Sequence, residues 1–394
     1  MPVEKTLKEL LAEITLQLEP SSDTASLDAQ VLVAHQLGKP RAWVMAHPEF
    51  QVSPAQYAQI SHAMERLRNG EPLPYVVGHW EFYGKDFILT PDVLIPRPDT
   101  ELLVEESIRW LKQHPTQRQA IDVGTGSGCI GISLAAAIPD LHLVLTDISG
   151  SALGVAQKNA LKHVLSGRME FVQANLLEGI AGYFDLICAN LPYIPTDMLK
   201  TLPVAIREPV LALDGGQDGI HLTSRLLEQA RRCLIPGGAI FLEIEALQGN
   251  EINMLAEKLY PAAQIKVIKS LAGWDRCVVI ERSRFLVHIC QREEWQRAQK
   301  YGSFQDDSLK QSGFIHCSTP EQVLEVANRF YRDVPDLVLL WLNPDLLLAN
   351  LHWEPTDGQL FPHVYGPINL QAVVSITNLC CDDDHTFRTI ELPV

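Results

Sequence analysis

The stretch that decides the fold is Ala120-Ile-Asp-Val-Gly-Thr-Gly-Ser-Gly128. A short apolar run that predicts a strand leads into three alternating glycines, and residues 130–138 then follow a helical pattern. Glycines at such a turn let the backbone approach a ligand closely, and the N–H groups at the helix N-terminus are free to bind it. A plain tight turn would have the same glycines, so the neighbouring elements matter. We expect five consecutive residues to bind a ligand: Gly124, Thr125, Gly126, Ser127 and Gly128.

The second predicted strand ends at Asp147, 19 residues beyond Gly128. An acidic side chain at this point commonly accepts hydrogen bonds from the hydroxyls of a ribose. Capping of a helix that begins near Ser149 would also explain it. The G-x-G-x-x-G spacing of dinucleotide sites is absent, because the third glycine comes two residues after the second. The spacing therefore favours S-adenosylmethionine over a nicotinamide dinucleotide.

Short apolar runs alternate with helical segments from about residue 119 to residue 282. Strands are predicted at 120–123, 141–146, 169–172, 184–189, 239–244 and 277–280, with helices between them such as 149–164 and 221–234. This alternation is typical of an α/β fold with a mostly parallel, Rossmann-like sheet covered on both faces. Ligands of such sheets bind beyond the carboxyl ends of the strands.

The segments on either side of this sheet have different patterns. Apolar residues at helical spacing predict a helical bundle over residues 1–74, and aromatic and β-branched residues around Gly84 predict a β-hairpin linker over 75–92. The sheet domain then covers 93–284. Residues 285–394 contain a separate set of aromatic residues and are expected to form a C-terminal α+β domain.

Composition excludes several classes of protein. The 394 residues suggest two or three domains, and 46% hydrophobic with 20% charged residues is typical of a globular protein. The net charge of −16 makes direct binding to nucleic acid or to an anionic membrane unfavourable.

No segment has the pattern of a signal peptide or a membrane span, and the longest uncharged stretch, 123–139, is short and interrupted by glycines. Eight cysteines without a C-x-x-C pair predict reduced thiols, no metal site and a cytoplasmic location.

The run 184–189 leads into Asn190-Leu-Pro-Tyr193, which resembles the Asn-Pro-Pro-Tyr motif of methyltransferases that act on planar amino nitrogens. The lone pair of such a nitrogen is delocalised, so it is a poor nucleophile. The Asn190 side-chain oxygen and the Leu191 carbonyl can accept hydrogen bonds from its two N–H groups and orient it. Pro192 is expected to belong to the same loop, and the Tyr193 ring would pack on the amide near the cationic methyl donor. A Pro-Tyr turn with a capping asparagine is the alternative.

Four further motifs extend the resemblance to the HemK/PrmC family. They are Ile95-Pro-Arg-Pro-Asp-Thr-Glu101, Arg207-Glu-Pro-Val-Leu-Ala-Leu213, Leu242-Glu-Ile-Glu245 with Gln248-Gly249, and Ala272-Gly-Trp-Asp-Arg-Cys-Val-Val279. The resemblance covers about residues 1–283. It implies a class I methyltransferase that uses S-adenosylmethionine to modify N5 of the glutamine in the Gly-Gly-Gln motif of peptide chain release factors. In that family the N-terminal helical domain helps to recognise the release factor.

The resemblance also implies site residues. Asn190, Leu191, Pro192 and Tyr193 would form the catalytic and substrate-binding loop, with Arg97 and Glu101 also contacting the substrate. Two positions depart from the family pattern: Leu191 stands where proline is usual, and Asn175 stands where an aspartate often contacts the adenine amino group. Because an amide oxygen also accepts that hydrogen bond, Asn175 and the adjacent Leu176 are expected to bind adenine. Asn190 is expected to contact the cofactor as well.

Three other functions stay open from sequence alone. An adenine-N6 methyltransferase of DNA or RNA acts on a similar amino group, but the acidic balance argues against it. A glutamine methyltransferase of a ribosomal protein shares the chemistry, and a non-catalytic scaffold would need none of the motifs. The enzyme is expected to act as a monomer.

The C-terminal 110 residues resemble a small bacterial domain of uncharacterised function, whose fold is thought to be similar to that of ADP-ribosyltransferases. Polar residues stand here among apolar ones: His316, Ser318, Glu354, His363 and Tyr365. They could line a nucleotide-like pocket, or the histidines could be hydrogen-bonded core residues. Both interpretations stay open, and the spacing of the histidines does not favour a metal.

Overall fold

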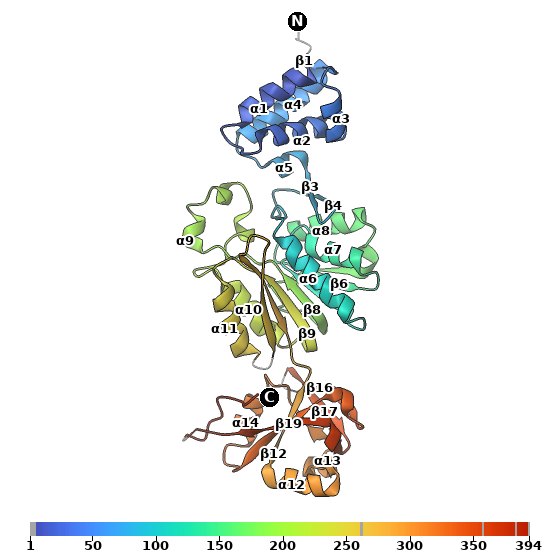
Figure 1. Ribbon diagram of the computed structural model, residues 1–394, viewed down its shortest axis with the longest axis vertical. Helices are drawn as coiled ribbons and strands as arrows, with labels where there is room; N and C mark the ends of the chain where they lie inside the picture. Colours follow the sequence, from blue (N-terminus) through green and yellow to red (C-terminus); the bar gives the residue numbers. More distant parts are fainter. Residues whose placement is uncertain (1–4, 261–262, 357, 383, 393–394) are drawn as a thin grey trace.

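The computed structural model describes residues 5–260, 263–356, 358–382 and 384–392. Three regions follow one another along the long axis of the molecule (Figure 1). The helical region lies at the N-terminal end, the α/β domain in the middle, and the C-terminal domain at the other end.

The N-terminal region is the expected helical bundle. Its elements are β1 (Lys5–Thr6), α1 (Leu7–Leu18), α2 (Ala25–Leu37), α3 (Arg41–Ala46), β2 (Gln51–Val52), α4 (Pro54–Arg68) and α5 (Leu73–Val77). Thr6 and Ser53 each form a capping box at the start of α1 and α4, which satisfies N–H groups that the helix itself cannot pair. The apolar residues at helical spacing in α1 face the core of the bundle, where Leu7, Leu10 and Ile14 are buried.

The linker hairpin is shorter than predicted. Tyr75–Val77 were expected in a strand but belong to helix α5. Pro72 and Pro74 restrict φ to values that suit the first turn of a helix, and Gly78 ends the helix with a left-handed φ of 77°. The strands of the hairpin are β3 (His79–Phe82) and β4 (Lys85–Ile88).

The central domain has the predicted alternation of strands and helices. Its helices are α6 (Thr100–Gln113), α7 (Cys129–Ala137), α8 (Gly150–Lys162), α9 (Thr196–Leu199), α10 (His221–Ala230) and α11 (Gly249–Leu259), with 3-10 turns at Ser166–Arg168, Pro203–Ile206 and Val210–Ala212. Its strands are β5 (Gln119–Val123), β6 (His142–Asp147), β7 (Met169–Gln173), β8 (Phe184–Ala189), β9 (Leu234–Glu243), β10 (Gln264–Lys269) and β11 (Asp275–Glu281). All six predicted strands are present, and β10 is the strand that the pattern did not reveal.

In the described part of the chain these strands form one seven-stranded sheet with the order β10-β11-β9-β8-β5-β6-β7. The strands from β9 to β7 are parallel, whereas β11 and β10 are antiparallel to their neighbours. Helices α6 and α7 pack on one face, and α10 and α11 on the other. Burial on both faces explains why β8 is apolar at almost every position. The chain order reverses between β5 and β8, so a crevice opens at their carboxyl ends.

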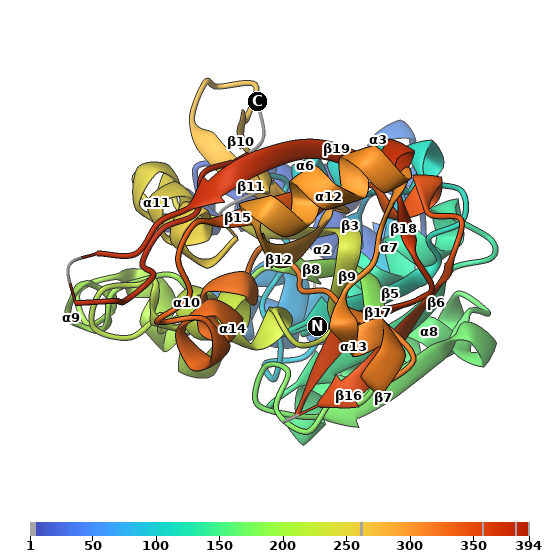
Figure 2. The same ribbon diagram turned by 90° about the horizontal axis from the view of Figure 1, so that it is seen from below.

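The C-terminal domain is the expected separate α+β unit. Its elements are β12 (Leu286–Gln291), α12 (Arg292–Tyr301), β13 (Ser303–Phe304), α13 (Asp307–Gln311), β14 (Ile315–His316), α14 (Val323–Phe330), β15 (Leu337–Leu342), β16 (Asn350–Thr356), β17 (Gln359–Tyr365), β18 (Ile368–Asn369) and β19 (Val373–Leu379), with 3-10 turns at Pro344–Leu346 and Leu370–Ala372. The strands form two antiparallel sheets, β12-β15-β19 and β14-β17-β16, and a short β13-β18 pair. Helices α12 and α13 lie at the end farthest from the bundle, nearest the viewer in Figure 2.

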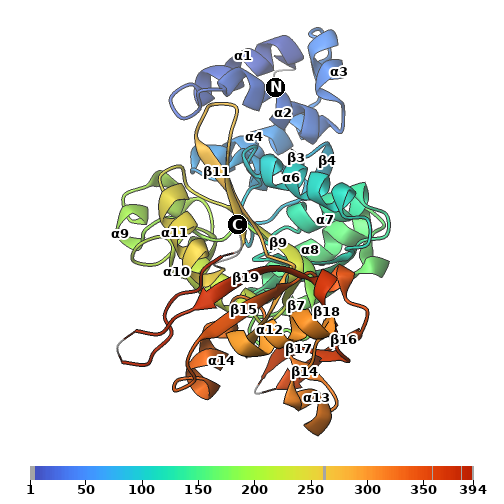
Figure 3. The ribbon, with the colours of Figure 1, turned by 60° about the horizontal axis from the view of Figure 1, so that its bottom comes forward.

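Figure 3 shows β15 and β19 of the C-terminal domain in front of the central domain. Strand β15 is buried along its whole length and contributes to apolar clusters on both of its faces. The eight cysteines are unpaired, and six of them are buried. Among the described residues, none of the helices is both long enough and apolar enough to cross a membrane.

Candidate functional site

A pocket of about 330 Å³ lies at the carboxyl ends of β5, β6 and β8. This volume lies within the range of roughly 300–1,000 Å³ that is typical of small-molecule sites. Residues from four separate segments meet here: Gly124, Thr125, Gly126, Ser127, Asp147, Asn175, Leu176, Asn190, Leu191 and Pro192. The structure thus brings together eight of the nine residues that were predicted to bind the cofactor.

The buried carboxylate of Asp122 fixes the backbone of the glycine loop. This residue was not assigned a role from the sequence. Asp122 Oδ2 accepts hydrogen bonds from Thr125 Oγ1 at 2.6 Å and from the Gly131 N–H at 3.0 Å. Burial raises the pKa of Asp122 to about 6, although these hydrogen bonds favour the charged form. The predicted residue that does not line the pocket is Gly128. It is the N-cap of α7 with a φ of 82°, and a Cβ there would lie 2.9 Å from Ile132 Cδ1.

Asp147 joins two loops at the rim of the pocket. One carboxylate oxygen accepts from the Gly126 N–H at 2.9 Å, and the other accepts from the Ser149 N–H at the same distance. Burial is the main cause that raises its pKa. The cap of α8 is Ser149, whose side chain accepts from the Ala152 N–H at 3.2 Å. Capping therefore does not explain Asp147, and contact with a ribose stays the prediction for this carboxylate.

Asn175 and Leu176 follow β7 on the same rim. Leu176 adopts a φ of 58°, which is uncommon for a residue with a branched apolar side chain. Backbone strain of this kind persists only where the surroundings hold it, and it is frequent at ligand sites. This placement is compatible with the predicted adenine contact.

Asn190 is oriented by two residues from other elements. Its Nδ2 donates to Thr100 Oγ1 at 3.2 Å. Glu243, at the end of β9, is 5% exposed, and burial raises its pKa to about 7 while interactions with Thr100 and Asn190 favour the carboxylate. The NH2 group of Asn190 therefore faces the protein. No described residue donates a hydrogen bond to Asn190 Oδ1 or to the Leu191 carbonyl, so both acceptors remain for a substrate.

Thr100 and Glu243 were not predicted as site residues, although both stand inside motifs that suggested the family. No feature of those motifs revealed their role, because 143 positions of sequence separate them. Their contact with Asn190 exists only because α6 starts beside the carboxyl ends of β8 and β9.

Tyr193 lies next to the pocket and does not line it. Burial raises the pKa of its phenol to about 12. Its carbonyl accepts from Gln248 Nε2 at 3.1 Å, and a Cβ at Gly215 would lie 2.8 Å from the Pro192 carbonyl oxygen. A glycine at 215 and Gln248 thus fix the backbone of the catalytic loop. Neither residue was assigned this role from sequence.

Arg97 and Glu101 also lie outside the lining of the pocket. Arg97 pairs with Glu208, whose carboxylate also accepts from the Ile95 N–H at 3.1 Å. Glu101 accepts from the Tyr83 N–H at 2.8 Å and so ties the linker hairpin to α6. Arg97 and Glu101 thus contact other parts of the same chain. Contact with the substrate by these two residues stays a prediction.

The C-terminal domain brings most of its predicted residues together on the β14-β17-β16 sheet. The ring centroids of His316 and His363 are 5.2 Å apart. Glu354 accepts a 2.6 Å hydrogen bond from the Tyr365 hydroxyl, and its other oxygen lies 2.7 Å from His363 Nδ1. Ser318 differs, because it is buried and its backbone pairs with Val287 of β12.

Phe314, which was not predicted, stacks on His363 with ring centroids 4.1 Å apart. His316 is exposed, so this cluster reaches the surface of the domain. Burial strongly raises the pKa of the neighbouring Cys317 thiol, which disfavours it as a nucleophile. A ligand for this cluster stays a prediction.

Comparison with known proteins gives three family matches. The PrmC N-terminal domain matches residues 9–78, the Methyltransferase small domain matches 99–267, and the Protein of unknown function (DUF952) matches 289–376. A solved structure, protein CC0527 from Caulobacter crescentus, is 33% identical and covers 26% of this chain and 93% of its own, with a TM-score of 0.25.

The first two regions are similar to enzymes of one kind. The release factor glutamine methyltransferase of Moorella thermoacetica is 40% identical over 281 residues, which are 70% of this chain and 99% of that protein. The solved protein-(glutamine-N5) methyltransferase (release factor-specific) of Alicyclobacillus acidocaldarius is 31% identical, with a TM-score of 0.31, and covers 50% of this chain and 99% of its own. This chain therefore belongs to the release factor glutamine methyltransferase family.

Proposed function

We propose that this protein transfers a methyl group from S-adenosylmethionine to N5 of the glutamine in the Gly-Gly-Gln motif of peptide chain release factors. Membership of the family supports the reaction and the release factor substrate. One observation carries the assignment of residues. The Asn190 NH2 group is bound by Thr100, and the two acceptors that remain at residues 190 and 191 face no described donor.

The pocket at the ends of β5, β6 and β8 fits the methyl donor. The turn needs glycine, since a Cβ at Gly124 would lie 3.0 Å from Leu191 Cδ2. In this proposal the glycine loop approaches the donor, Asp147 accepts from the ribose hydroxyls, and Asn175 accepts from the adenine amino group. When bound there, S-adenosylmethionine supplies an electrophilic methyl group on a sulfonium centre.

The protein contributes orientation rather than a strong base. The glutamine amide donates one N–H to Asn190 Oδ1 and the other to the Leu191 carbonyl, which fixes the direction of the nitrogen lone pair. A new N–C bond then forms as the S–C bond breaks, and the nitrogen releases one proton to solvent. Acceptors that are already in place stabilise the positive charge that develops on the nitrogen without reorganisation.

Leu191 replaces the usual proline of the motif without loss of the acceptor. Its side chain is buried against the glycine loop, so packing restrains the backbone where the pyrrolidine ring would otherwise restrict φ. We therefore propose an active site that is slightly less rigid than that of relatives with proline.

The remaining assignments follow from the resemblance and the charge. In this proposal the N-terminal bundle recognises the release factor, and the enzyme acts as a cytoplasmic monomer without direct contact to nucleic acid. The net charge of −16 supports a protein substrate over DNA or RNA.

The test is mass spectrometry of a release factor that has been incubated with enzyme and S-adenosylmethionine. The expected result is the mass gain of a single methyl group on the peptide that contains Gly-Gly-Gln, and a much slower gain with the Asn190→Ala variant. Parallel incubations contain duplex DNA or a mixture of ribosomal proteins. A methyl group on those substrates, with none on the release factor, would contradict the proposal.

A further inference from the structure

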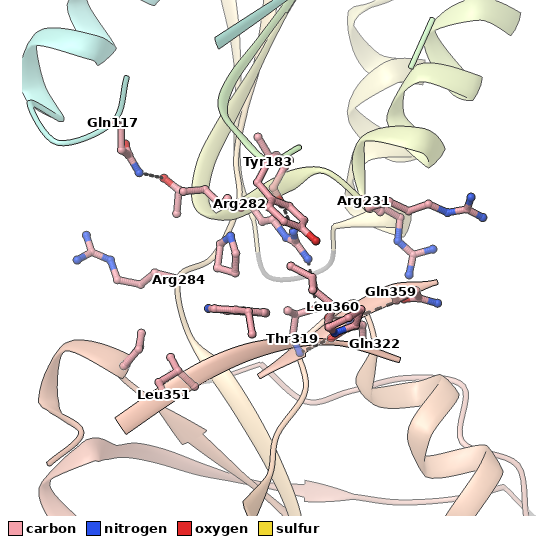
Figure 4. Close-up of a pocket in the computed structure, with 18 of the residues that line it drawn as sticks. Gln117, Tyr183, Arg231, Arg282, Arg284, Thr319, Gln322, Leu351, Gln359 and Leu360 are labelled. Carbon is pink, nitrogen blue, oxygen red and sulfur yellow. Dashed lines mark hydrogen bonds between the residues drawn. The ribbon is translucent and has the colours of Figure 1, made fainter. Parts of the chain in front are cut away.

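A larger cavity, of about 800 Å³, lies between the central and C-terminal domains. Its upper wall comes from the amino ends of the central strands, with Gln117 before β5, Tyr183 before β8 and Gly237 in β9. Its lower wall comes from β16, β17 and the segment before α14 (Figure 4). The active-site pocket lies at the carboxyl ends of the same sheet, so the two cavities are separate.

The charge of this cavity is opposite to that of the whole protein. Four arginines line it, namely Arg231, Arg232, Arg282 and Arg284, and no aspartate or glutamate is among its described lining residues. The chain carries a net charge of −16. Figure 4 shows Arg231 and Arg284 on opposite sides, with Tyr183 and Arg282 between them. A local excess of positive charge in an acidic protein favours an anionic ligand.

One of these arginines holds the two domains together. The guanidinium of Arg282 pairs with the carboxylate of Glu321 at 3.0 Å, and both side chains are almost completely buried. The Arg231 guanidinium donates a hydrogen bond to the backbone carbonyl of Glu321 at 2.8 Å. Glu321 therefore neutralises Arg282, whereas no carboxylate of a described residue pairs with Arg231 or Arg232.

The polar groups around the cavity differ in how far they are paired within the protein. The Nε atoms of Arg231 and Arg282 have no hydrogen-bond partner among the described residues, and neither has Gln117 Oε1. These atoms are closed off from solvent, so they do not themselves contact a ligand in the cavity. Arg232 is exposed and makes no side-chain hydrogen bond or ion pair with described residues, so it is available to a ligand.

The cavity also presents aromatic surface from both walls, with Tyr183 above and Trp353 of β16 below. Aromatic faces bind planar rings, and arginine guanidinium groups bind phosphate with two parallel hydrogen bonds. The volume is that of a small-molecule site. We propose that this interdomain cavity binds a nucleotide, with its phosphates on Arg231 and Arg232 and its base against Trp353.

Calorimetric titration of the full chain tests the proposal, with ATP, GTP, adenosine and inorganic phosphate as separate probes. Saturating S-adenosylhomocysteine is present throughout, so that the active-site pocket does not contribute. We expect at least one of the two nucleotides to bind, and adenosine and phosphate to bind at least tenfold more weakly. The Arg232→Gln variant should weaken nucleotide binding at least tenfold, since its side chain has no structural partner whose loss would disturb folding. Arg41→Gln, an exposed arginine of α3, is the matched control and should leave binding unchanged.

Three results would overturn the proposal. One is the absence of binding by either nucleotide. Another is equal binding of phosphate and nucleotide, which would show an anion site without base recognition. The third is nucleotide binding that Arg232→Gln leaves intact, because this result would place the nucleotide outside the interdomain cavity. The melting temperature of each variant, measured in parallel, shows whether it is folded.

Discussion

The central and C-terminal domains build their polar clusters in different ways. In the central domain, the glycine loop and Asn190 follow parallel strands and Asp147 is the last residue of another, and the carboxyl ends of parallel strands lie at one edge of the sheet. In the C-terminal domain, antiparallel register makes the cluster: His363 of β17 is paired with His316 of β14 on one side and with His352 of β16 on the other. A motif that follows a strand is therefore enough to predict the first site, whereas the second requires knowledge of the register.

The two domains also differ in how the surroundings control the polar groups. Asn190 and Glu243 lie in a buried environment in which burial raises the pKa of Glu243 to about 7. Glu354 lies at the surface, where hydrogen bonds from Tyr365 and His363 hold its pKa below the usual value. We expect substitutions in the first site to have large effects on catalysis and substitutions in the second to have none.

The largest effect is expected at the contact that joins the two domains. Glu321→Ala leaves Arg282 buried without its partner, which typically costs about 3–5 kcal/mol in the free energy of unfolding. Burial alone would raise the pKa of Glu321, but the Arg282 guanidinium, together with hydrogen bonds from Thr319 and the backbone, holds the pKa below the usual value. The pair should therefore lose its contribution as the pH falls below about 4.5.

Urea denaturation measures this loss of stability. The control is Glu325→Ala, an exposed glutamate on α14, which should change the free energy of unfolding by less than about 0.5 kcal/mol. Equal effects of the two substitutions would show that the domains do not depend on the buried pair.

The second effect is on catalysis alone. Asn190→Ala removes one of the two acceptors for the substrate amide, and by analogy with oxyanion-hole donors we expect kcat to fall roughly 10²–10³-fold, which is about 2.7–4 kcal/mol. Initial rates of methylation measure the effect, and the melting temperature should not change.

The matched substitution in the other domain, His363→Ala, should leave the rate of methylation as it is. A loss of rate in this variant comparable to that of Asn190→Ala would break the distinction between the two clusters.

The third effect is on pH dependence. Because the pKa of Glu243 is raised to about 7, the rate should fall as the pH decreases below 7, when protonation weakens the acceptor that helps to orient Asn190. Stability should change in the opposite sense. The folded protein holds this proton more tightly than the unfolded chain, so the free energy of unfolding falls as the pH rises from about 4.5 to 7.

Glu243→Gln separates this ionisation from the others. The variant keeps an acceptor, so the rate at pH 8 should fall by only about fivefold, or about 1 kcal/mol. Its pH profile should lack the inflection near 7. If the inflection persists in this variant, another group is responsible for it.

The smallest effect is expected at the surface cluster. Tyr365→Phe removes the hydrogen bond that contributes most to lowering the pKa of Glu354, so this pKa should rise toward its usual value. An NMR titration of the Glu354 side chain measures it. The rate of methylation should not change, and a change in rate would indicate coupling between the C-terminal cluster and the active site.

The sequence by itself determined the mostly parallel sheet, the positions along the chain of its strands other than β10, and the residues at their ends. Apolar runs, glycine turns and polar residues directly after the strands are local features, so they can be recognised in the sequence without knowledge of the fold. Helical spacing likewise revealed the bundle, but it missed α5, where two prolines and Gly78 outweigh the β-branched residues.

Only the tertiary structure decided which polar groups meet. Glu243 and Thr100 orient Asn190 across 53 and 90 positions of sequence, and the row of histidines depends on the register of three antiparallel strands. The cavity between the domains has no local signal, because its arginines come from two separate segments, the chain directly after α10 and the chain directly after β11. Contacts between distant segments depend on how whole elements pack, and a local pattern does not contain that information.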